Sequence, residues 1–378
     1  MKNAAPRYVD ERNGLSYDIN ELRWCSEKRA PLMITPLPGI TRDDIDTRER
    51  SIWRYRAALP VEIARPISLG EGCTPLVAKR WGGVDVMFKL EWFNPTSSFK
   101  DRGASVMVSF LKQLGVESLI EDSSGNGGAA IAASCAAAGI KARILAPDST
   151  SPAKLLQSRS FGAEVQGVPG SRQDTENEAL RQSETTFYAS HNWHPFFLQG
   201  TKSLAYELWE ELGFKAPDNV IIPTGAGSNV LGCDIGFCEL RAAGQIKKLP
   251  KLLIAQPANC APIHATFQAN SDTLVETVYD KTIAEGTAIR SPVRLQEVLA
   301  AIRRSGGDTV ALTESDIVAA VRKLTGMGLY AEPTSAQAAA AVDAFVARGV
   351  IKPGETTVVI LTGTGLKAGN LMGDIFSA

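Results

Sequence analysis

The hydrophobic positions of the chain change their pattern near Val84. From there on, short apolar runs alternate with longer segments of helical periodicity. Such runs are typical of buried strands, and their alternation with helices predicts an α/β protein with a largely parallel sheet. The predicted strands cover residues 84–90, 118–122, 142–147, 163–168, 219–224, 251–257 and 356–362.

Helical periodicity is clearest after Phe99. The apolar positions there follow the i, i+3, i+4, i+7 spacing, which predicts a helix with one buried face that ends near Gly115. The segment 127–139 is so rich in small residues that its helix must lie very close to neighbouring backbone. Further helix boundaries are expected at Gly139, at Gly162 and at a capping box of Thr313 with Asp316.

The first sixty or so residues show neither pattern. They include a charge-rich stretch from Thr41, and they predict an irregular arm that leads into a short helix. At about 100–200 residues per domain, a chain of this length predicts two domains or lobes. Because no Pro/Ser-rich linker and no repeat divides the chain, the two lobes are expected to be interleaved in sequence.

Composition and charge exclude several function classes. The 378 residues carry 40 Lys+Arg against 41 Asp+Glu, so there is no basic footprint for nucleic acid or an anionic membrane. The N-terminus lacks the apolar core of a secretory signal, which favours the cytoplasm. The six cysteines form no CxxC and predict reduced thiols without a metal site. His191 and His194 lie three residues apart but have no third ligand nearby, which favours packing over metal binding.

Five short segments carry the candidate chemistry. Each places glycines, small polar residues or a lysine just after a predicted strand, where open α/β sheets bind ligands. The segments are GEGCTPL (70–76), NPTSSFKDRG (94–103), SSGNGG (123–128), PTGAGSN (223–229) and LTGTGLK (361–367).

The segment PTGAGSN predicts a phosphate cradle. It follows a strand and opens a helix near Ser228, so that backbone N–H groups and the positive end of the helix point at one spot. Taken alone, its glycines favour a tight turn over a phosphate site. A nucleoside triphosphate loop is excluded because no GK[ST] is present, and the dinucleotide fingerprint GxGxxG is absent from the first strand-turn-helix unit.

Lys100 is the candidate reactive amine. It lies at the expected start of a helix, next to Phe99 and a Ser/Thr cluster. Partial desolvation there would lower the pKa of the lysine, as an imine-forming amine requires. A phosphate cradle, such a lysine and loops of small residues together suggest pyridoxal phosphate as the cofactor.

In this order and spacing, the five segments resemble the fold-type II pyridoxal-phosphate enzymes of the tryptophan synthase beta superfamily, and most closely the threonine synthase family, over residues 69–367. The resemblance implies two open, twisted, mainly parallel α/β lobes with the cofactor in the cleft between them. It implies an N-terminal arm and first part of a large domain at 1–92, a small mobile domain at 93–191 and the rest of the large domain at 192–378. A homodimer is implied as well.

The resemblance also implies roles for individual residues. Lys100 would hold the cofactor as a Schiff base and shuttle a proton, and Asn126 would contact the ring hydroxyl of the cofactor. The implied phosphate-binding residues are Gly225, Ala226, Gly227, Ser228 and Asn229. The implied substrate-binding residues are Ser123, Ser124, Gly125, Asn192 and His194.

Two further residues bear on the cofactor. Thr362 resembles the hydroxyl partner of the pyridine nitrogen. A hydroxyl makes the ring a weaker electron sink than an aspartate would, which suits elimination and replacement at Cβ or Cγ. Glu332 resembles a glutamate near the cofactor in this superfamily, although an acid at the start of a helix is equally explained by the helix dipole.

The chain departs from the family pattern between Ser190 and Ser203. Where the threonine synthase family has a phosphate-binding arginine, this sequence has Phe197, which cannot make a bidentate phosphate contact. Ser97 stands where the family usually has glycine. Either another cation takes the arginine's place, or the enzyme handles a different amino acid. The candidate cations are Arg159, Arg172 and Lys202.

The leading interpretation is therefore a pyridoxal-phosphate lyase of threonine synthase type, which would convert O-phosphohomoserine to threonine and phosphate. The closest alternative is a threonine or serine dehydratase or another β-eliminating or β-replacing lyase. Ser335, where the family's dehydratases usually have glycine, favours the synthase branch. A non-catalytic cofactor binder and a plain nucleotide-binding protein remain as alternatives from other classes.

Overall fold

The computed structural model of the protein describes residues 5–377. Its described residues fall into two compact units, and each consists of three chain segments. Unit 1 comprises the described part of Met1–Cys73, together with Asn94–Thr96 and Lys100–Ser203. Unit 2 comprises Thr74–Phe93, Ser97–Phe99 and the described part of Leu204–Ala378. The division drawn from the sequence, after residues 92 and 191, differs from this grouping mainly in the first 73 residues, which group here with Lys100–Ser203.

Unit 2 is built on a six-stranded sheet of order β12-β11-β10-β13-β5-β4. All neighbouring strands are parallel except β4 and β5, which form an antiparallel hairpin. The two central strands β10 and β13 are buried at every residue, as expected for parallel strands covered on both faces. The strands are β4 (Leu76–Trp81), β5 (Val84–Leu90), β10 (Asn219–Pro223), β11 (Lys251–Pro257), β12 (Asp308–Leu312) and β13 (Thr357–Leu361).

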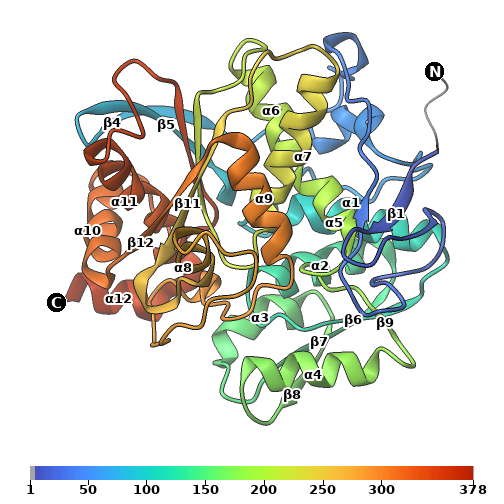
Figure 1. Ribbon diagram of the computed structural model, residues 1–378. Coiled ribbons are helices and arrows are strands. Elements are labelled where there is room, and N and C mark those ends of the chain that lie inside the picture. Colours follow the sequence, from blue (N-terminus) through green and yellow to red (C-terminus); the bar gives the residue numbers. More distant parts are fainter. Residues whose placement is uncertain (1–4, 378) are drawn as a thin grey trace. The chain divides into compact units, whose positions relative to one another are not determined.

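Helices cover both faces of this sheet. Figure 1 shows α10 (Glu314–Gly326) and α11 (Pro333–Ala347) on one side of strands β11 and β12, and α7 (Ser228–Ala242) and α9 (Leu295–Ser305) on the other. The predicted capping box begins α10, with both reciprocal bonds of Thr313 and Asp316 present. The other elements of unit 2 are α8 (Pro262–Gln268), α12 (Gly369–Ser377), η3 (Glu91–Phe93), η4 (Ala258–Cys260), η5 (Glu285–Thr287) and η6 (Gly365–Ala368).

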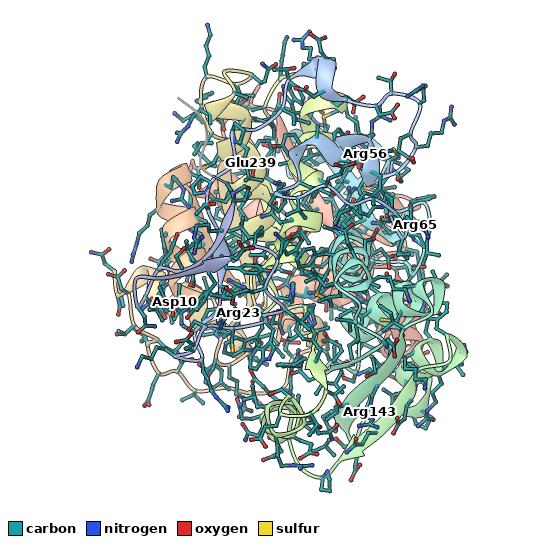
Figure 2. The ribbon with its side chains drawn as sticks, turned by 90° about the vertical axis from the view of Figure 1, so that its right-hand side faces the viewer. Asp10, Arg23, Arg56, Arg65, Arg143 and Glu239 are labelled. Atoms are coloured by element: carbon teal, nitrogen blue, oxygen red, sulfur yellow. The ribbon has the colours of Figure 1, made fainter. Side chains whose placement is uncertain are left out.

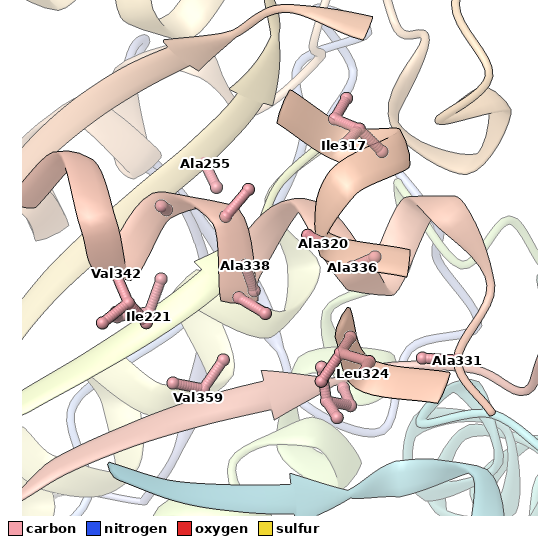
Figure 3. Close-up of a cluster of buried hydrophobic side chains, with 14 of the residues drawn as sticks. Ile221, Ala255, Ile317, Ala320, Leu324, Ala331, Ala336, Ala338, Val342 and Val359 are labelled. Carbon is pink, nitrogen blue, oxygen red and sulfur yellow. The ribbon is translucent and has the colours of Figure 1, made fainter. Parts of the chain in front are cut away.

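The core of unit 2 lies between the sheet and α10 and α11. Ile221 and Val359, from neighbouring strands, meet the alanine-rich face of α11 at Ala338 and Val342 (Figure 3). Leu324 of α10 closes the same cluster and is fully buried. Small side chains on α11 let the helix approach the sheet closely, so the carboxyl ends of the strands are held in fixed positions.

Unit 1 contains a four-stranded, wholly parallel sheet of order β8-β7-β6-β9. Figure 2 labels Arg143, on its strand β7. The strands are β6 (Ser118–Glu121), β7 (Lys141–Pro147), β8 (Glu164–Val168) and β9 (Phe187–Tyr188). The helices are α1 (Lys100–Gln113), α2 (Asn126–Ala138), α3 (Pro152–Ser160), α4 (Arg172–Gln182) and α5 (Pro195–Thr201). Helix α6 (Ser203–Glu211) follows directly and lies almost wholly in unit 2.

The first sixty residues correct one prediction. Instead of an irregular arm, they form a small antiparallel sheet of β1 (Arg7–Asp10), β2 (Leu15–Asp18) and β3 (Met33–Ile34). Asp10 (Figure 2) accepts backbone hydrogen bonds from Arg12 and Asn13 and so closes the β1–β2 turn. The strands are too short for a visible alternation. The expected short helix is present as two 3₁₀ segments, η1 (Arg42–Asp44) and η2 (Ile52–Ala58).

The arm belongs to unit 1 because its apolar residues share the core of that unit. Tyr8 and Leu32 are fully buried in one cluster with Met107 of α1 and Phe196 of α5. This packing also corrects the prediction that α1 buries a single face, since residues 101–111 are all buried. All seven strands predicted from apolar runs are present, whereas β1–β4, β9 and β12 were not predicted. Among the described residues, no helix is long and apolar enough to cross a membrane.

Candidate active site

The predicted site residues fall in both units, and each group is described within its own unit. In unit 2, the predicted phosphate cradle lies between the end of β10 and the start of α7. Gly227 caps α7 in the left-handed region, with φ of 92°, and a Cβ there would overlap Cγ2 of Val298. Gly225 lies against Thr287, whose Cα would be 3.0 Å from an added Cβ. The loop therefore requires its glycines, and it presents backbone N–H groups at the N-terminus of α7.

Asn229, in the first turn of α7, has a buried side chain that is unsatisfied within the protein. It is 3% exposed, and neither its amide oxygen nor its amide nitrogen has a hydrogen-bond partner. Buried amides are nearly always paired, so an unpaired one beside an N-terminal cradle indicates a polar ligand. The five residues predicted to hold a phosphate, Gly225 to Asn229, are thus brought together in a form that fits an anion.

Thr362 follows β13 and is held by a hydroxyl that the sequence did not predict as a site residue. Its Oγ1 lies 3.0 Å from Oγ of Ser335, which also accepts a bond from the backbone N–H of Gly363. A hydroxyl has one proton to donate. Oγ of Ser335 also lies 3.0 Å from the carbonyl oxygen of Gly363, so its proton serves either that carbonyl or Thr362. In the second arrangement the proton of Thr362 is available to an external acceptor such as an unprotonated pyridine nitrogen. The 27-residue separation of the two hydroxyls left no local signal.

The segment that leads to Lys100 pairs with the same end of β13. The backbone N–H of Phe99 donates to the carbonyl oxygen of Thr362 at 3.1 Å, and Ser98 forms a β-bridge with Gly363. Oγ of Ser98 is buried without a partner, so it is a second polar atom here that a ligand would satisfy. Ser97 has φ of 64°, in the left-handed region that favours glycine. This conformation is the physical reason why a glycine suits that position.

Glu332 stands at the start of α11. It is the N-cap residue of that helix, it is 9% exposed, and its backbone N–H donates to the carbonyl oxygen of Gly363 at 3.2 Å. Both interpretations of its carboxylate, contact with the cofactor and interaction with the helix dipole, are compatible with this place.

In unit 1, Lys100 is the first residue of α1 and is half-buried. Burial lowers the pKa of its amine to about 7, and the charge of Arg172 also lowers the pKa, while Glu121 raises it. Nζ of Lys100 lies 5.5 Å from the centroid of the Phe197 ring. An amine in this setting is partly unprotonated near neutral pH, as nucleophilic and proton-transfer chemistry require.

The predicted substrate loop joins β6 to α2. Ser123 is buried, Ser124 and Asn126 are half-buried, and Gly125 is the exposed N-cap residue of the helix. The backbone N–H of Gly125 contacts Oγ of Ser123 at 3.4 Å. Because the loop opens a helix, its N–H groups and hydroxyls form a suitable place for a carboxylate.

Residues 190–194 follow β9, the neighbouring strand of the same sheet. His191 is buried and hydrogen-bonded to Glu121, a pair that sequence reasoning missed. Asn192 is half-buried, and its backbone N–H donates to Oγ of Ser190. His194 caps α5, where Nδ1 accepts from the backbone N–H of Phe196 at 3.2 Å. The capping and packing of His194 are structural, and its assignment to the substrate stays a prediction.

Comparison with known proteins identifies the family. The family model described as "Pyridoxal-phosphate dependent enzyme" matches residues 67–363. A threonine synthase of Methanocaldococcus jannaschii is 34% identical over 368 residues, which are 94% of this chain and 91% of that protein. A threonine synthase of Synechocystis is 35% identical over 332 residues, 83% of this chain and 84% of that one. The chain belongs to the pyridoxal-phosphate-dependent enzyme family.

Solved structures show the same fold. The processed threonine deaminase isoform 2 of Solanum lycopersicum has a TM-score of 0.70 at 22% identity and covers 90% of each chain. Maize serine racemase has a TM-score of 0.67 at 22% identity and covers 80% of this chain and 92% of that one. The predicted fold-type II class is thereby confirmed. So are the pyridoxal-phosphate cofactor and the assignment as a pyridoxal-phosphate-dependent lyase similar to threonine synthases.

The residues present fit this cofactor. Its phosphate suits the cradle of Gly225–Asn229, where the amide of Asn229 lacks a protein partner. Its pyridine nitrogen suits a neutral hydroxyl such as that of Thr362, and its aldehyde suits an amine with the lowered pKa of Lys100.

Phe197, where the chain departs from the family pattern, is tightly packed. Phe197 is fully buried, and a Cβ added to Gly103 of α1 would lie 2.5 Å from its ring. Of the three candidate cations, Lys202 is buried, with Nζ bonded to the carbonyl oxygen of Ala58 at 2.6 Å. Arg159 and Arg172 are exposed, on α3 and α4. Only the charge of Arg172 is felt at Lys100 and Glu121.

Proposed function

We propose that this lyase converts O-phosphohomoserine and water to threonine and phosphate. The observation that carries the proposal is the place of Lys100, half-buried at the start of α1 beside the Phe197 ring, where burial lowers the pKa of its amine to about 7. Similarity to threonine synthases over more than four-fifths of the chain supports the choice of substrate. Lys100 as the reactive amine and Gly225–Asn229 with Thr362 as cofactor ligands are part of this proposal.

The cofactor, when bound, withdraws electrons from the carbon atom next to the substrate's nitrogen. The protein's own groups do the rest. The serines and N–H groups of the loop at residues 123–125 hold the substrate carboxylate, which fixes the orientation of Cα. The amine of Lys100 accepts a proton from the substrate and returns it at a neighbouring carbon, a task for which a pKa near the working pH is best. The phosphate leaves Cγ with the electron pair of its C–O bond, and a water molecule supplies the hydroxyl group at Cβ and the remaining proton.

We propose that Arg172 binds the substrate phosphate in place of the family's arginine. Strand β8 leads to Arg172 at the start of α4, and strand β6 leads to the substrate loop. Because the sheet is wholly parallel, both connections leave from the same edge. The guanidinium of Arg172 is exposed, and its charge affects the pKa values of Lys100 and Glu121. A planar, permanently charged group is suited to a phosphate.

Phosphate release from O-phospho-L-homoserine tests the proposal. The cofactor-loaded protein is expected to release phosphate and threonine in equal amounts, and Lys100→Ala to release neither. Arg172→Gln is expected to raise KM about tenfold or more with a smaller change in kcat. Arg181→Gln on the same helix, whose partner is the surface residue Glu178, is the matched control and should behave like the unchanged protein. Equal KM values for Arg172→Gln and this control would exclude Arg172.

A second candidate function is β-elimination from serine or threonine, and the buried aromatic ring at Phe197 favours it. A phosphate-free substrate needs no cation at that place. The test is formation of an oxo acid and ammonia from L-threonine or L-serine, with no phosphate released from O-phosphohomoserine. Ser335 counts against this candidate. The family's dehydratases usually have glycine at this position, whereas here the hydroxyl of Ser335 bonds to Thr362. Cofactor binding without turnover of any of these amino acids would mean that the protein binds pyridoxal phosphate without being an enzyme for them.

We also propose that the enzyme is a homodimer, as the resemblance implies. Sedimentation of the cofactor-loaded protein tests this. A mass near twice that of the 40.4 kDa chain is expected, and a single-chain mass at micromolar concentration would exclude it.

A further inference from the structure

Glu121 and His191 form a buried pair in unit 1 that the proposed reaction does not use. Glu121 ends β6, and His191 follows the neighbouring strand β9. One carboxylate oxygen lies 2.7 Å from Nδ1 of His191, and the other accepts the backbone N–H of His191 at 3.0 Å. Glu121 is fully buried and His191 is 5% exposed. Because burying an acid is costly unless it is bonded, this two-point contact fixes the imidazole firmly relative to the sheet.

One side of the imidazole supports the substrate loop. A Cβ added to Gly127 would lie 2.8 Å from both Nδ1 and Cε1 of His191, and 3.0 Å from Oγ of Ser123. The first turn of α2 therefore rests on the ring of His191. Any movement of the ring would be transmitted to the loop at residues 123–125, which opens that helix.

The imidazole also packs against Phe197. The two ring centroids are 5.6 Å apart, at an angle of 60°. Phe197 in turn packs on Gly103 and lies beneath the amine of Lys100, with Nζ 5.5 Å from its ring centroid. A continuous series of contacts thus runs from Glu121 through His191 and Phe197 to the amine.

We infer that Glu121 and His191 are positioning residues that hold the Lys100 amine, through Phe197, at a fixed place relative to the substrate loop. The inference rests on the proposed role of Lys100. It goes further by assigning a function to the aromatic residue that replaces the family's arginine. In this assignment the ring of Phe197 supports the lysine, and the buried acid sets the electrostatics beneath it.

The charges around the pair agree with this assignment. Burial raises the pKa of Glu121 to about 8 and lowers the pKa of His191 well below its usual value. The carboxyl of Glu121 therefore ionises near pH 8, and once ionised it raises the pKa of the Lys100 amine. The ionisable groups that interact with Glu121 are Lys100 of α1, Asp122, Cys135 of α2, Arg172 of α4, Tyr188 of β9 and His191.

The test uses the cofactor-loaded protein and two optical readouts that do not depend on the natural substrate. The first is the pH midpoint of the cofactor absorbance, which follows protonation of the Lys100 nitrogen. The second is the rate at which aminooxyacetate displaces Lys100 from the cofactor. The variants are Glu121→Gln, His191→Asn and their combination. Glu176→Gln is the matched control, since Glu176 is an acid of the same unit, with a raised pKa, that bonds to Trp193 instead.

Glu121→Gln is expected to lower the pH midpoint, because Glu121 raises the pKa of Lys100. Each single variant should slow displacement about tenfold, and the double variant should be no slower than the slower single one, since both act through one contact series. Glu176→Gln should change neither readout. An unchanged or raised midpoint in Glu121→Gln, or slowdowns that multiply in the double variant, would overturn the inference.

Folding is checked by circular dichroism. Should Glu121→Gln fail to fold, Glu121→Asp, which withdraws the carboxylate by one methylene, serves in its place. Slowed displacement is then expected, and an unchanged rate overturns the inference. Failure of the proposed function is separate: it is seen as missing phosphate release, or as a Lys100→Ala protein whose cofactor spectrum equals that of the unchanged protein.

Discussion

The two groups of site residues are built on different principles. In unit 2 the proposed cofactor ligands are backbone groups, hydroxyls and an amide, positioned by a glycine loop and by the ends of fully buried strands. In unit 1 the residues around Lys100 are buried acids, a histidine and an aromatic ring, several with strongly shifted pKa values. The first group is neutral and fixed by shape. The second is ionisable and depends on side chains that contact one another across the sheet.

This difference indicates which part of the enzyme sets its substrate. The cofactor loop agrees with the family pattern, as binding an unchanging cofactor requires. Of the two departures, Phe197 lies in unit 1, together with the unpredicted acid pair, and Ser97 lies in the segment of unit 2 that leads to Lys100. A change of substrate within a family is expected in the groups that meet the substrate, because the fold and the cofactor are shared.

The largest effect is expected where the family's arginine is restored. Phe197→Arg buries an unpaired cation beside Lys100 in a place packed against Gly103. We expect a loss of about 3 kcal/mol or more in the free energy of unfolding. Urea unfolding measures it. Phe197→Leu, which keeps the site apolar, should lose clearly less. An Arg variant of unchanged stability that binds inorganic phosphate more tightly would mean that the aromatic site is interchangeable with the family's arginine.

A steric change alone should disrupt the proposed phosphate loop. Gly227→Ala places a Cβ against Val298 at a φ of 92°, and both the overlap and the backbone strain oppose it. We expect a loss of about 2 kcal/mol in stability and weaker cofactor binding, measured by equilibrium dialysis of pyridoxal phosphate. Gly373→Ala in α12, where an added Cβ meets nothing within 4 Å, is the control and should be neutral or stabilising. Equal cofactor affinity in both variants would contradict the shape argument.

The sequence predicts the first group of site residues better than the second. The glycine loop was predictable because a strand end, glycines and a helix start follow one another within seven residues, at 223–229, while its role toward the cofactor stays a prediction. Glu121 and His191 are 70 residues apart and meet only because β6 and β9 are paired. A signal was present in SLIED, a buried strand that ends in two acids. The same limit applies to Ser335 with Thr362, and to β1–β3, which are four, four and two residues long.

The ionisable residues Glu121 and Lys100 make the stability of the cofactor-free protein depend on pH. Between pH 4.5 and about 8, the folded protein keeps a proton on Glu121 that the unfolded chain has lost, so stability falls as pH rises. The slope is at most about 1.4 kcal/mol per pH unit for one such group. Between about 7 and 10.5 Lys100 acts in the opposite sense, since the unfolded chain holds the extra proton.

Urea unfolding of the unchanged protein and of Glu121→Gln, from pH 5 to 7, isolates the first contribution. The difference in unfolding free energy should move in favour of the glutamine variant as pH rises. A constant difference would mean that Glu121 is ionised in the folded protein and that the acid pair is an ordinary ion pair.

The smallest effect concerns Ser97, in the segment of unit 2 that leads directly to Lys100. Its φ of 64° costs a non-glycine residue about 1 kcal/mol. Ser97→Gly removes that strain but adds backbone freedom to the unfolded chain, so the net gain should be at most about 1 kcal/mol. Ser151→Gly is the matched control, because Ser151 has φ of −60° and no capping bond, and it should lose stability. Thermal unfolding measures both variants. A gain in stability without a change in kcat would show that the strain is incidental, whereas a gain accompanied by slower turnover would show that Ser97 helps to set the position of the lysine.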